Sequence, residues 1–174
     1  MTMTDPIQNA PVYKITVLGD PGVGKTAILY QFTQNQFHET IDPTISEIFT
    51  KLSQFDGEYA RMTLQDTAGQ DAFKAMREQY TRNANGFLIV YSITDQKSLD
   101  NVEKYYVSIK QIKNVDSFPC VMLVANKQDL SSERSVSETC ENDLCQRLDL
   151  PKIDSSAKTK LNIEEAFHRV VSQI

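Results

Sequence analysis

The sequence predicts an α/β domain of three layers, in which a mostly parallel sheet is flanked by helices on both faces. Apolar strand-like runs alternate along the chain with helical patterns. Two of these runs, "GFLIVYSI" and "PCVMLVAN", are continuously apolar, which is typical of strands buried on both faces of a parallel sheet. The length of 174 residues suits one domain with a full-sized core.

The first half of the chain predicts a strand, a helix, a long loop and a hairpin. The run "YKITVLG" (13–19) predicts a buried strand, and a helix is expected over about 25–34. The segment "NQFHETIDPTISE" has no clear period and contains Asp-Pro, so we expect a long and functional loop. The runs "IFTKLSQ" and "YARMTLQD" flank Asp56-Gly57 and predict a β-hairpin.

The second half continues the alternation. Helices are expected near 73–82, 96–113, 136–148 and 162–173, and strands at 86–93, 119–126 and 152–155. The first eleven residues are polar and lack the apolar stretch of a signal peptide. We therefore expect a flexible arm at 1–11 and a single domain over 12–174.

The composition excludes several classes of protein. A net charge of −5 argues against binding to nucleic acid through overall positive charge. No apolar run approaches the roughly 20 residues of a membrane span. The three cysteines are odd in number and show no metal-ligand spacing, so we expect reduced thiols in a cytoplasmic protein, with a redox role as the alternative.

The stretch "GDPGVGKT" (19–26) matches the pattern G-x-x-x-x-G-K-[ST] between a predicted strand and a predicted helix. Glycines allow the backbone to curl around a phosphate, and the following helix offers free N–H groups to the anion. In this pattern Lys25 reaches the β- and γ-phosphates and the Thr26 hydroxyl ligates Mg²⁺. The alternative is a strand-to-helix turn that binds nothing. The pattern predicts a nucleoside triphosphate binder, a class that includes ATPases, kinases and GTPases.

The tetrapeptide "NKQD" (126–129) directly follows an apolar strand, at the edge of the sheet where ligands bind in α/β proteins. The Asp129 carboxylate can accept two hydrogen bonds from guanine, and adenine has no matching pair of donors. Asn126 can bridge the base to neighbouring loops, and the Lys127 stem can lie over the ring. The stretch "SSAK" (155–158) follows another short strand, and its backbone can meet the guanine carbonyl. Alone, "NKQD" fits a solvated turn equally well, but the ordered set of motifs indicates guanine.

With these motifs, the sequence resembles the small GTPases of the Ras superfamily over about residues 12–174. The matching stretches are "GDPGVGKT", "DPTI", "LQDTAGQDAFKAMREQYTRNANGFLIVYSI", "NKQDL" and "SSAK". The stretches "DTAGQ" and "AMREQY" are closest to the Ras branch. The resemblance implies a P-loop GTPase fold, known as a G domain, with a six-stranded sheet. It also implies bound GTP or GDP with Mg²⁺ and slow hydrolysis of GTP to GDP.

The resemblance further implies the site residues. The nucleotide would be bound by Gly22, Val23, Gly24, Lys25, Thr26, Ala27, Phe37, His38, Glu39, Thr44, Gly69, Asn126, Lys127, Asp129, Ser156, Ala157 and Lys158. The metal would be held by Thr26, Thr44 and Asp66. The catalytic residues would be Lys25, Thr44, Gly69 and Gln70.

Two loops would sense the γ-phosphate. Thr44 would ligate Mg²⁺ and contact the γ-phosphate through its N–H, so that hydrolysis releases the first loop. Asp66 would hold Mg²⁺ through water, the Gly69 N–H would touch the γ-phosphate, and Gln70 would orient the attacking water. On residue type alone, Thr44 could be a turn threonine and Phe37 a core anchor.

These features predict a regulatory switch with an exchange factor, a GTPase-activating protein and effectors as partners. The alternative is a nucleotide-binding module of the same fold with negligible hydrolysis. We expect a monomer that binds no nucleic acid. The chain carries neither a C-a-a-X motif nor a polybasic tail, so we expect membrane association only if a lipidated tail is absent from this chain. The apolar residues Ile41, Ile45, Ile48 and Phe49 fit an effector contact and a half-buried edge strand equally well.

Five positions depart from the pattern of the Ras branch, and the smallest change is Ala125, which precedes "NKQD" where glycine is common. Pro21 stands where glycine is common and has no backbone N–H. The family places the phosphate-facing amides at 22–27, after the proline, so binding should tolerate it and only the rate of hydrolysis is in question. Ile41 replaces a usual tyrosine, and Ser46 and Ile48 change positions that effectors read. Effector identities therefore do not transfer to this chain.

Overall fold

The computed structural model describes residues 7–42, 46–67, 73–114 and 120–174, apart from the side chain of Ser46. Within these ranges the strands are β1 (Val12–Leu18), β2 (Ser46–Phe55), β3 (Glu58–Thr67), β4 (Gly86–Ser92), β5 (Cys120–Asn126) and β6 (Lys152–Asp154). The helices are α1 (Lys25–Gln34), α2 (Lys74–Asn83), α3 (Gln96–Asp100), α4 (Val102–Lys113), α5 (Glu138–Leu148) and α6 (Ile163–Gln173), with a 3₁₀ helix, η2 (Gln128–Glu133).

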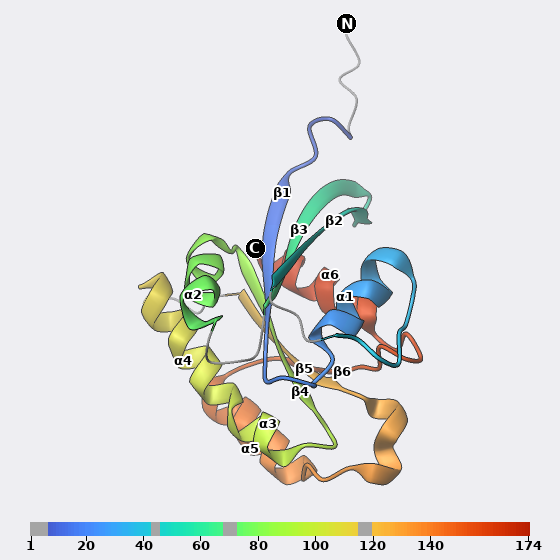
Figure 1. The fold of residues 1–174 in the computed structure, drawn as a ribbon. Helices are drawn as coiled ribbons and strands as arrows, with labels where there is room; N and C mark the ends of the chain where they lie inside the picture. Colours follow the sequence, from blue (N-terminus) through green and yellow to red (C-terminus); the bar gives the residue numbers. More distant parts are fainter. Residues whose placement is uncertain (1–6, 43–45, 68–72, 115–119) are drawn as a thin grey trace, which may run out of the picture.

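The strands form one sheet in the order β2-β3-β1-β4-β5-β6. Only the β2–β3 pair is antiparallel, and the other neighbours run parallel. Helices α1 and α6 cover one face, while α2, α3, α4 and α5 lie on the other (Figure 1). The structure thus confirms the predicted three-layer α/β fold with a mostly parallel sheet of six strands.

Both faces of the central strands are buried, as their continuous apolar sequences predict. Every residue of β4 is buried, because α6 packs on one side of it and α4 on the other. The rings of Phe32 from α1 and Phe167 from α6 are stacked, with their centroids 4.0 Å apart. They belong to the apolar core between the sheet and helices α1 and α6. On the second face, Tyr106 and Ile109 of α4 pack against β4 and β5.

The hairpin forms around Asp56-Gly57, and both residues adopt positive φ angles of 49° and 90°. That backbone matches the twist of a tight hairpin and suits an Asp-Gly pair. In β3, the buried residues Ala60, Met62 and Leu64 follow the half-buried residues Tyr59, Arg61 and Thr63 in alternation. The last residues of β3 are all buried, because the strand runs between β1 and β2 beneath α1.

The helix expected over 96–113 is divided at Asn101 into α3 and α4. No described helix has both the length and the apolar character needed to cross a lipid bilayer. All parallel strands point their carboxyl ends toward one edge of the sheet, where the loops after β1, β3 and β5 meet.

Candidate functional site

The loop between β1 and α1 curls tightly and depends on glycine. Gly19, Gly22 and Gly24 adopt φ angles of 145°, 80° and 99°. A Cβ at Gly24 would overlap the amide of Asn126, and a Cβ at Gly19 would overlap the carbonyl oxygen of Val90. The glycines therefore serve both the turn and the close approach of neighbouring strands. Pro21 lies exposed at the tip of this loop.

Lys25 is the first residue of α1, and its side chain folds back across the loop. Its Nζ donates to the carbonyl oxygens of Gly19 and Asp20, both at 2.9 Å. Burial lowers the pKa of the Lys25 ammonium to about 8, and the carboxylates of Asp66 and Asp20 oppose that shift. The ammonium therefore lies in a poorly hydrated place where an anionic ligand would favour its charged form.

A hydroxyl and a carboxylate meet beside Lys25. Thr26 Oγ1 donates a short hydrogen bond to Asp66 Oδ2, and Asp66 is fully buried near the end of β3. Both groups are hard oxygen donors, which fit Mg²⁺. Among the residues that the structure describes, no three His, Cys, Asp or Glu side chains cluster as a metal site. One hydroxyl and one carboxylate suit Mg²⁺, because that ion usually keeps waters and substrate phosphates among its ligands.

The loop after β5 is tied to the phosphate loop by two hydrogen bonds. Asn126 Nδ2 donates to the Val23 carbonyl oxygen at 2.9 Å, and Lys127 Nζ donates to the Gly22 carbonyl oxygen at 2.7 Å. Asn126 is almost fully buried, and Lys127 adopts a φ of 70° at the start of η2. The two motifs, about a hundred residues apart in the chain, thus form one rigid surface.

The segment after β6 completes the far end of the site. Ser156 Oγ donates to Asp129 Oδ1 at 2.6 Å, which holds one carboxylate oxygen in place. The backbone N–H of Ala157 donates to Asn126 Oδ1 at 3.3 Å, and Gln31 Nε2 of α1 donates to the Ala157 carbonyl oxygen at 2.7 Å. Asp129 is therefore oriented by the loop that follows β6.

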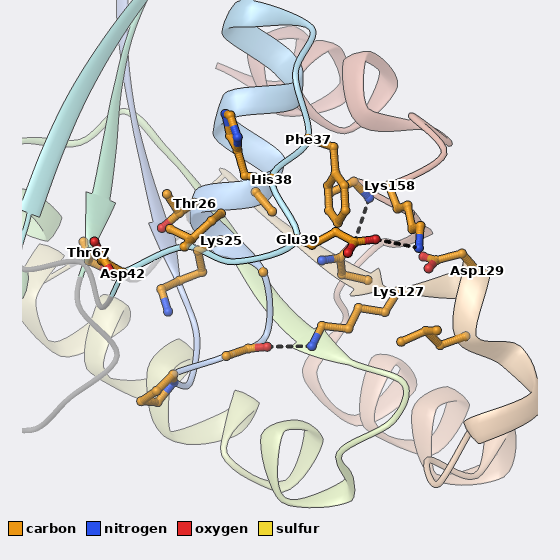
Figure 2. A pocket seen from close by; sticks show the side chains of 18 residues that line it. Lys25, Thr26, Phe37, His38, Glu39, Asp42, Thr67, Lys127, Asp129 and Lys158 are labelled. Carbon is orange, nitrogen blue, oxygen red and sulfur yellow. Dashed lines mark hydrogen bonds and ion pairs between the residues drawn. The ribbon is translucent and has the colours of Figure 1, made fainter.

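These loops enclose a cavity of about 600 Å³. Figure 2 shows Lys25 and Thr26 on one side of it, and Lys127, Asp129 and Lys158 on the other. Of the residues predicted from sequence, the cavity is lined by Gly22, Gly24, Lys25, Thr26, Ala27, Phe37, His38, Glu39, Asn126, Lys127, Asp129, Ala157 and Lys158. Val23, Asp66 and Ser156 lie behind this lining and hydrogen-bond to residues of it.

The first loop after α1 contributes an aromatic side chain, an imidazole and a carboxylate. Phe37 is half-buried against the core, and the exposed His38 packs edge-on against Tyr30 with ring centroids 5.3 Å apart. Glu39 pairs with Lys158 at 3.4 Å across the mouth of the cavity. Both partners are largely exposed, so this ion pair adds little stability.

Five further residues line the cavity and were not predicted from sequence to bind the nucleotide: Pro21, Ile41, Asp42, Thr67 and Leu130. Four of them lie inside matching stretches, namely "GDPGVGKT", "DPTI", "DTAGQ" and "NKQDL", and Ile41 directly precedes "DPTI". Their place in or beside a motif was the signal that could have found them. Three predicted residues, Thr44, Gly69 and Gln70, lie outside the described residues, as does Ile45. Of the remaining apolar residues near the first loop, Phe49 is buried in the core and Ile48 is exposed on β2, the edge strand.

A glycine loop between a strand and a helix, in an open α/β sheet, defines a P-loop nucleotide-binding protein. The family model described as "Ras family" matches residues 14–174. The chain is also similar to the Ras-like protein RAS2 of Hydra vulgaris, with 41% identity over 162 residues, which cover 93% of this chain and 84% of that protein. The chain belongs to the Ras family.

Family membership confirms the class of activity predicted from the motifs. Members of this family are small GTPases, which bind guanine nucleotides with Mg²⁺ and hydrolyse GTP to GDP. The chain is a GTP-binding regulatory switch. Proteins of this family have regulators and effectors as partners.

Proposed function

We propose that the 600 Å³ cavity holds GTP or GDP, with the phosphates at Lys25 and the guanine at Asp129. The observation that carries this proposal is the direct link between the two motifs. Asn126 and Lys127 of the base loop both donate to carbonyl oxygens of the phosphate loop. Such links fix the separation between a phosphate cradle and a base site, which a nucleotide must span.

The phosphates would lie against the start of α1. The N–H groups of residues 22–27 would face the anion at the positive end of the helix dipole. The Lys25 ammonium has three N–H donors, so it could keep its bonds to the two loop carbonyls and direct the third toward the β- and γ-phosphates. The proline at position 21 costs this cradle no donor, because it precedes the phosphate-facing amides.

The guanine would lie between Phe37, Lys127 and the loop of Ser156–Lys158. The Asp129 carboxylate, held by Ser156 Oγ, would accept from the ring N1–H and the exocyclic amine of guanine. The N–H groups at Ala157 and Lys158 would meet the guanine carbonyl. His38 and Glu39 would line the ribose, chiefly through backbone atoms.

We place Mg²⁺ at Thr26, Thr44 and Asp66. When bound, the ion would neutralise negative charge on the β- and γ-phosphates. The Thr26 hydroxyl and the Asp66 carboxylate already face one another, so this chain holds two of the three ligand groups in contact before the nucleotide arrives.

Hydrolysis would depend on Gln70, with Thr44 and Gly69 contacting the γ-phosphate. An amide is a poor base, so Gln70 would position water and stabilise developing charge. Ras itself hydrolyses GTP at roughly 10⁻⁴ s⁻¹ until a partner supplies an arginine, and we take that slow rate as the expectation here. So slow a reaction suits a timer that effectors read.

The domain and its setting are also part of the proposal. Residues 12–174 would form a single G domain preceded by an arm, acting as a monomer in the cytoplasm. An exchange factor would release GDP, and a GTPase-activating protein would supply the missing arginine. Ile48, exposed on the edge strand β2, is positioned for an effector to contact.

Single-turnover hydrolysis of GTP tests this function. The wild type should release phosphate slowly, a GTPase-activating protein should accelerate it, and Gln70→Leu should nearly abolish it. A wild-type rate no faster than that of Gln70→Leu would contradict the proposal and favour a binding module without hydrolysis.

A further inference from the structure

One residue of the phosphate loop reaches across to the opposite helical layer. Asn101 Nδ2 donates to Asp20 Oδ2 at 2.6 Å, and the Tyr105 hydroxyl donates to Asp20 Oδ1 at 2.9 Å. Each carboxylate oxygen thus has its own donor from α4 or its start. Hydrogen bonds to a charged acceptor are stronger than those between neutral groups, so these two bonds hold Asp20 strongly against α4.

The backbone of the same residue holds Lys25. The carbonyl oxygen of Asp20 accepts from Lys25 Nζ at 2.9 Å, beside the equivalent bond from Gly19. The side chain of Asp20 therefore fixes a residue whose main chain positions the ammonium. Asp20 itself does not line the nucleotide cavity, because its carboxylate points toward α4.

Helix α4, which supplies the donors to Asp20, is packed firmly against the sheet. Asn101 stands at the junction of α3 and α4, and Tyr105 follows four residues later, so both side chains project from one face of the helix. The next face of α4 is anchored by Val102, Tyr106 and Ile109, which are almost fully buried against the sheet. The donors are thus held by the core and not by the phosphate loop.

We propose that Asp20 is a positioning residue for the nucleotide phosphates, tethering the phosphate loop to α4 through Asn101 and Tyr105 and so holding Lys25 in place. This inference rests on the proposed role of Lys25 at the β-phosphate. A loop that is already ordered would raise the affinity for the nucleotide phosphates, because less conformational entropy is lost on binding. Sequence alone gave no sign of this contact.

The affinity ratio of GMP and GDP isolates this effect. The two nucleotides share base, ribose and α-phosphate, and only GDP reaches the groups that Lys25 contacts at the β-phosphate. Dissociation constants are measured by competition against a fluorescent GDP analogue at saturating Mg²⁺. Asp20→Ala keeps the carbonyl that holds Lys25 and removes the tether together with one negative charge. It should weaken GDP about 10-fold, with GMP changed less than about twofold.

Tyr105→Phe removes one donor while leaving the Asp20 charge in place, and should weaken GDP about threefold. The matched control is Tyr106→Phe, on the same helix. The Tyr106 hydroxyl is buried and has no hydrogen-bond partner among the described residues, so its removal should leave both affinities unchanged. Thermal unfolding of each variant with saturating GDP reports any loss of the fold.

A reciprocal exchange tests the pairing itself. Asn101→Asp sets two carboxylates side by side and should weaken GDP more than Tyr105→Phe does. Adding Asp20→Asn restores a donor facing an acceptor, because Asn at position 20 can donate to Asp at position 101 and still accept from Tyr105. The double variant should recover most of the GDP affinity.

Three results would overturn the tether: GDP and GMP weakened equally, Tyr105→Phe indistinguishable from Tyr106→Phe, or no recovery in the double variant. A different result would contradict the proposed function itself. If the wild-type protein bound GMP as tightly as GDP, the phosphate site at Lys25 would itself be wrong.

Discussion

Thr26 Oγ1 donates a short hydrogen bond to Asp66 Oδ2, which joins the first turn of α1 to the end of β3. These two residues lie 40 apart in the chain, and each belongs to a different sequence motif. Their contact brings together two of the three groups that we assign to Mg²⁺. The fold would thus assemble part of the proposed metal site.

Replacing Thr26 should uncouple nucleotide binding from Mg²⁺. In the wild type, EDTA should greatly accelerate release of a fluorescent GDP analogue. Thr26→Ala should release it roughly 10-fold or more faster with Mg²⁺ present, because a metal ligand is lost. EDTA should then add little. The control is Thr33→Ala in the same helix, because the Thr33 hydroxyl donates to the Leu29 carbonyl oxygen and not to a residue assigned to Mg²⁺. Slow, EDTA-sensitive release from Thr26→Ala would contradict the assignment.

Asp129→Asn should change the base that the protein selects. An amide donates where the carboxylate accepts, so the variant should lose roughly 10²-fold or more in GTP affinity and gain affinity for xanthosine triphosphate. Equilibrium competition with both nucleotides measures the change. Asp143→Asn, on the exposed face of α5, is the control for loss of a negative charge. Unchanged GTP affinity in Asp129→Asn would remove Asp129 from the guanine site.

Pro21 should affect the rate of hydrolysis more than binding. Pro21→Gly should bind GDP within about twofold of the wild type, since no phosphate-facing N–H is gained. Compared with this variant, the wild type should show at most a partial loss of partner-stimulated hydrolysis. Phosphate release over a single turnover, with and without a GTPase-activating protein, compares the two. A large gain in the intrinsic rate of Pro21→Gly would instead show that the proline slows the unassisted reaction.

Phe167→Ala should test the core that supports α1. Its ring stacks on Phe32 and is fully buried, so truncation should lower the free energy of unfolding by about 3–5 kcal/mol. Urea unfolding at saturating GDP gives the value. Arg169→Ala removes an exposed ion pair on the same helix and should change stability by less than about 0.5 kcal/mol. A similar loss in both variants would contradict the stacking argument.

The sequence predicted most of the fold because local patterns and tertiary packing agree. Continuous apolar runs gave β4 and β5, and Asp56-Gly57 placed the hairpin. The division of the helix at Asn101 was not predicted, since the apolar period continues through it. At the division Asn101 keeps φ −82° and ψ −10°, and its side chain donates to Asp20 at 2.6 Å, a contact that no local pattern predicts.

The nucleotide site shows the same difference between what local sequence patterns predict and what tertiary contacts add. Motifs with fixed spacing identified the phosphate loop, the base loop and the loop after β6, and the structure brings them around one cavity. The contacts that tie those motifs together could not be read from sequence. The bonds from Lys127 to Gly22 and from Tyr105 to Asp20 join residues 105 and 85 positions apart. Such pairs depend on how layers pack, and no local pattern records them.

We propose that the cavity between Lys25 and Asp129 is a guanine nucleotide site. The most direct test is to denature the purified protein and identify the released nucleotide by chromatography and mass spectrometry. If the proposal is right, the protein releases GDP or GTP in a stoichiometric amount and loses that nucleotide when it is purified in EDTA. An adenine nucleotide, or a protein that is free of nucleotide and does not take up GDP with Mg²⁺, would contradict it.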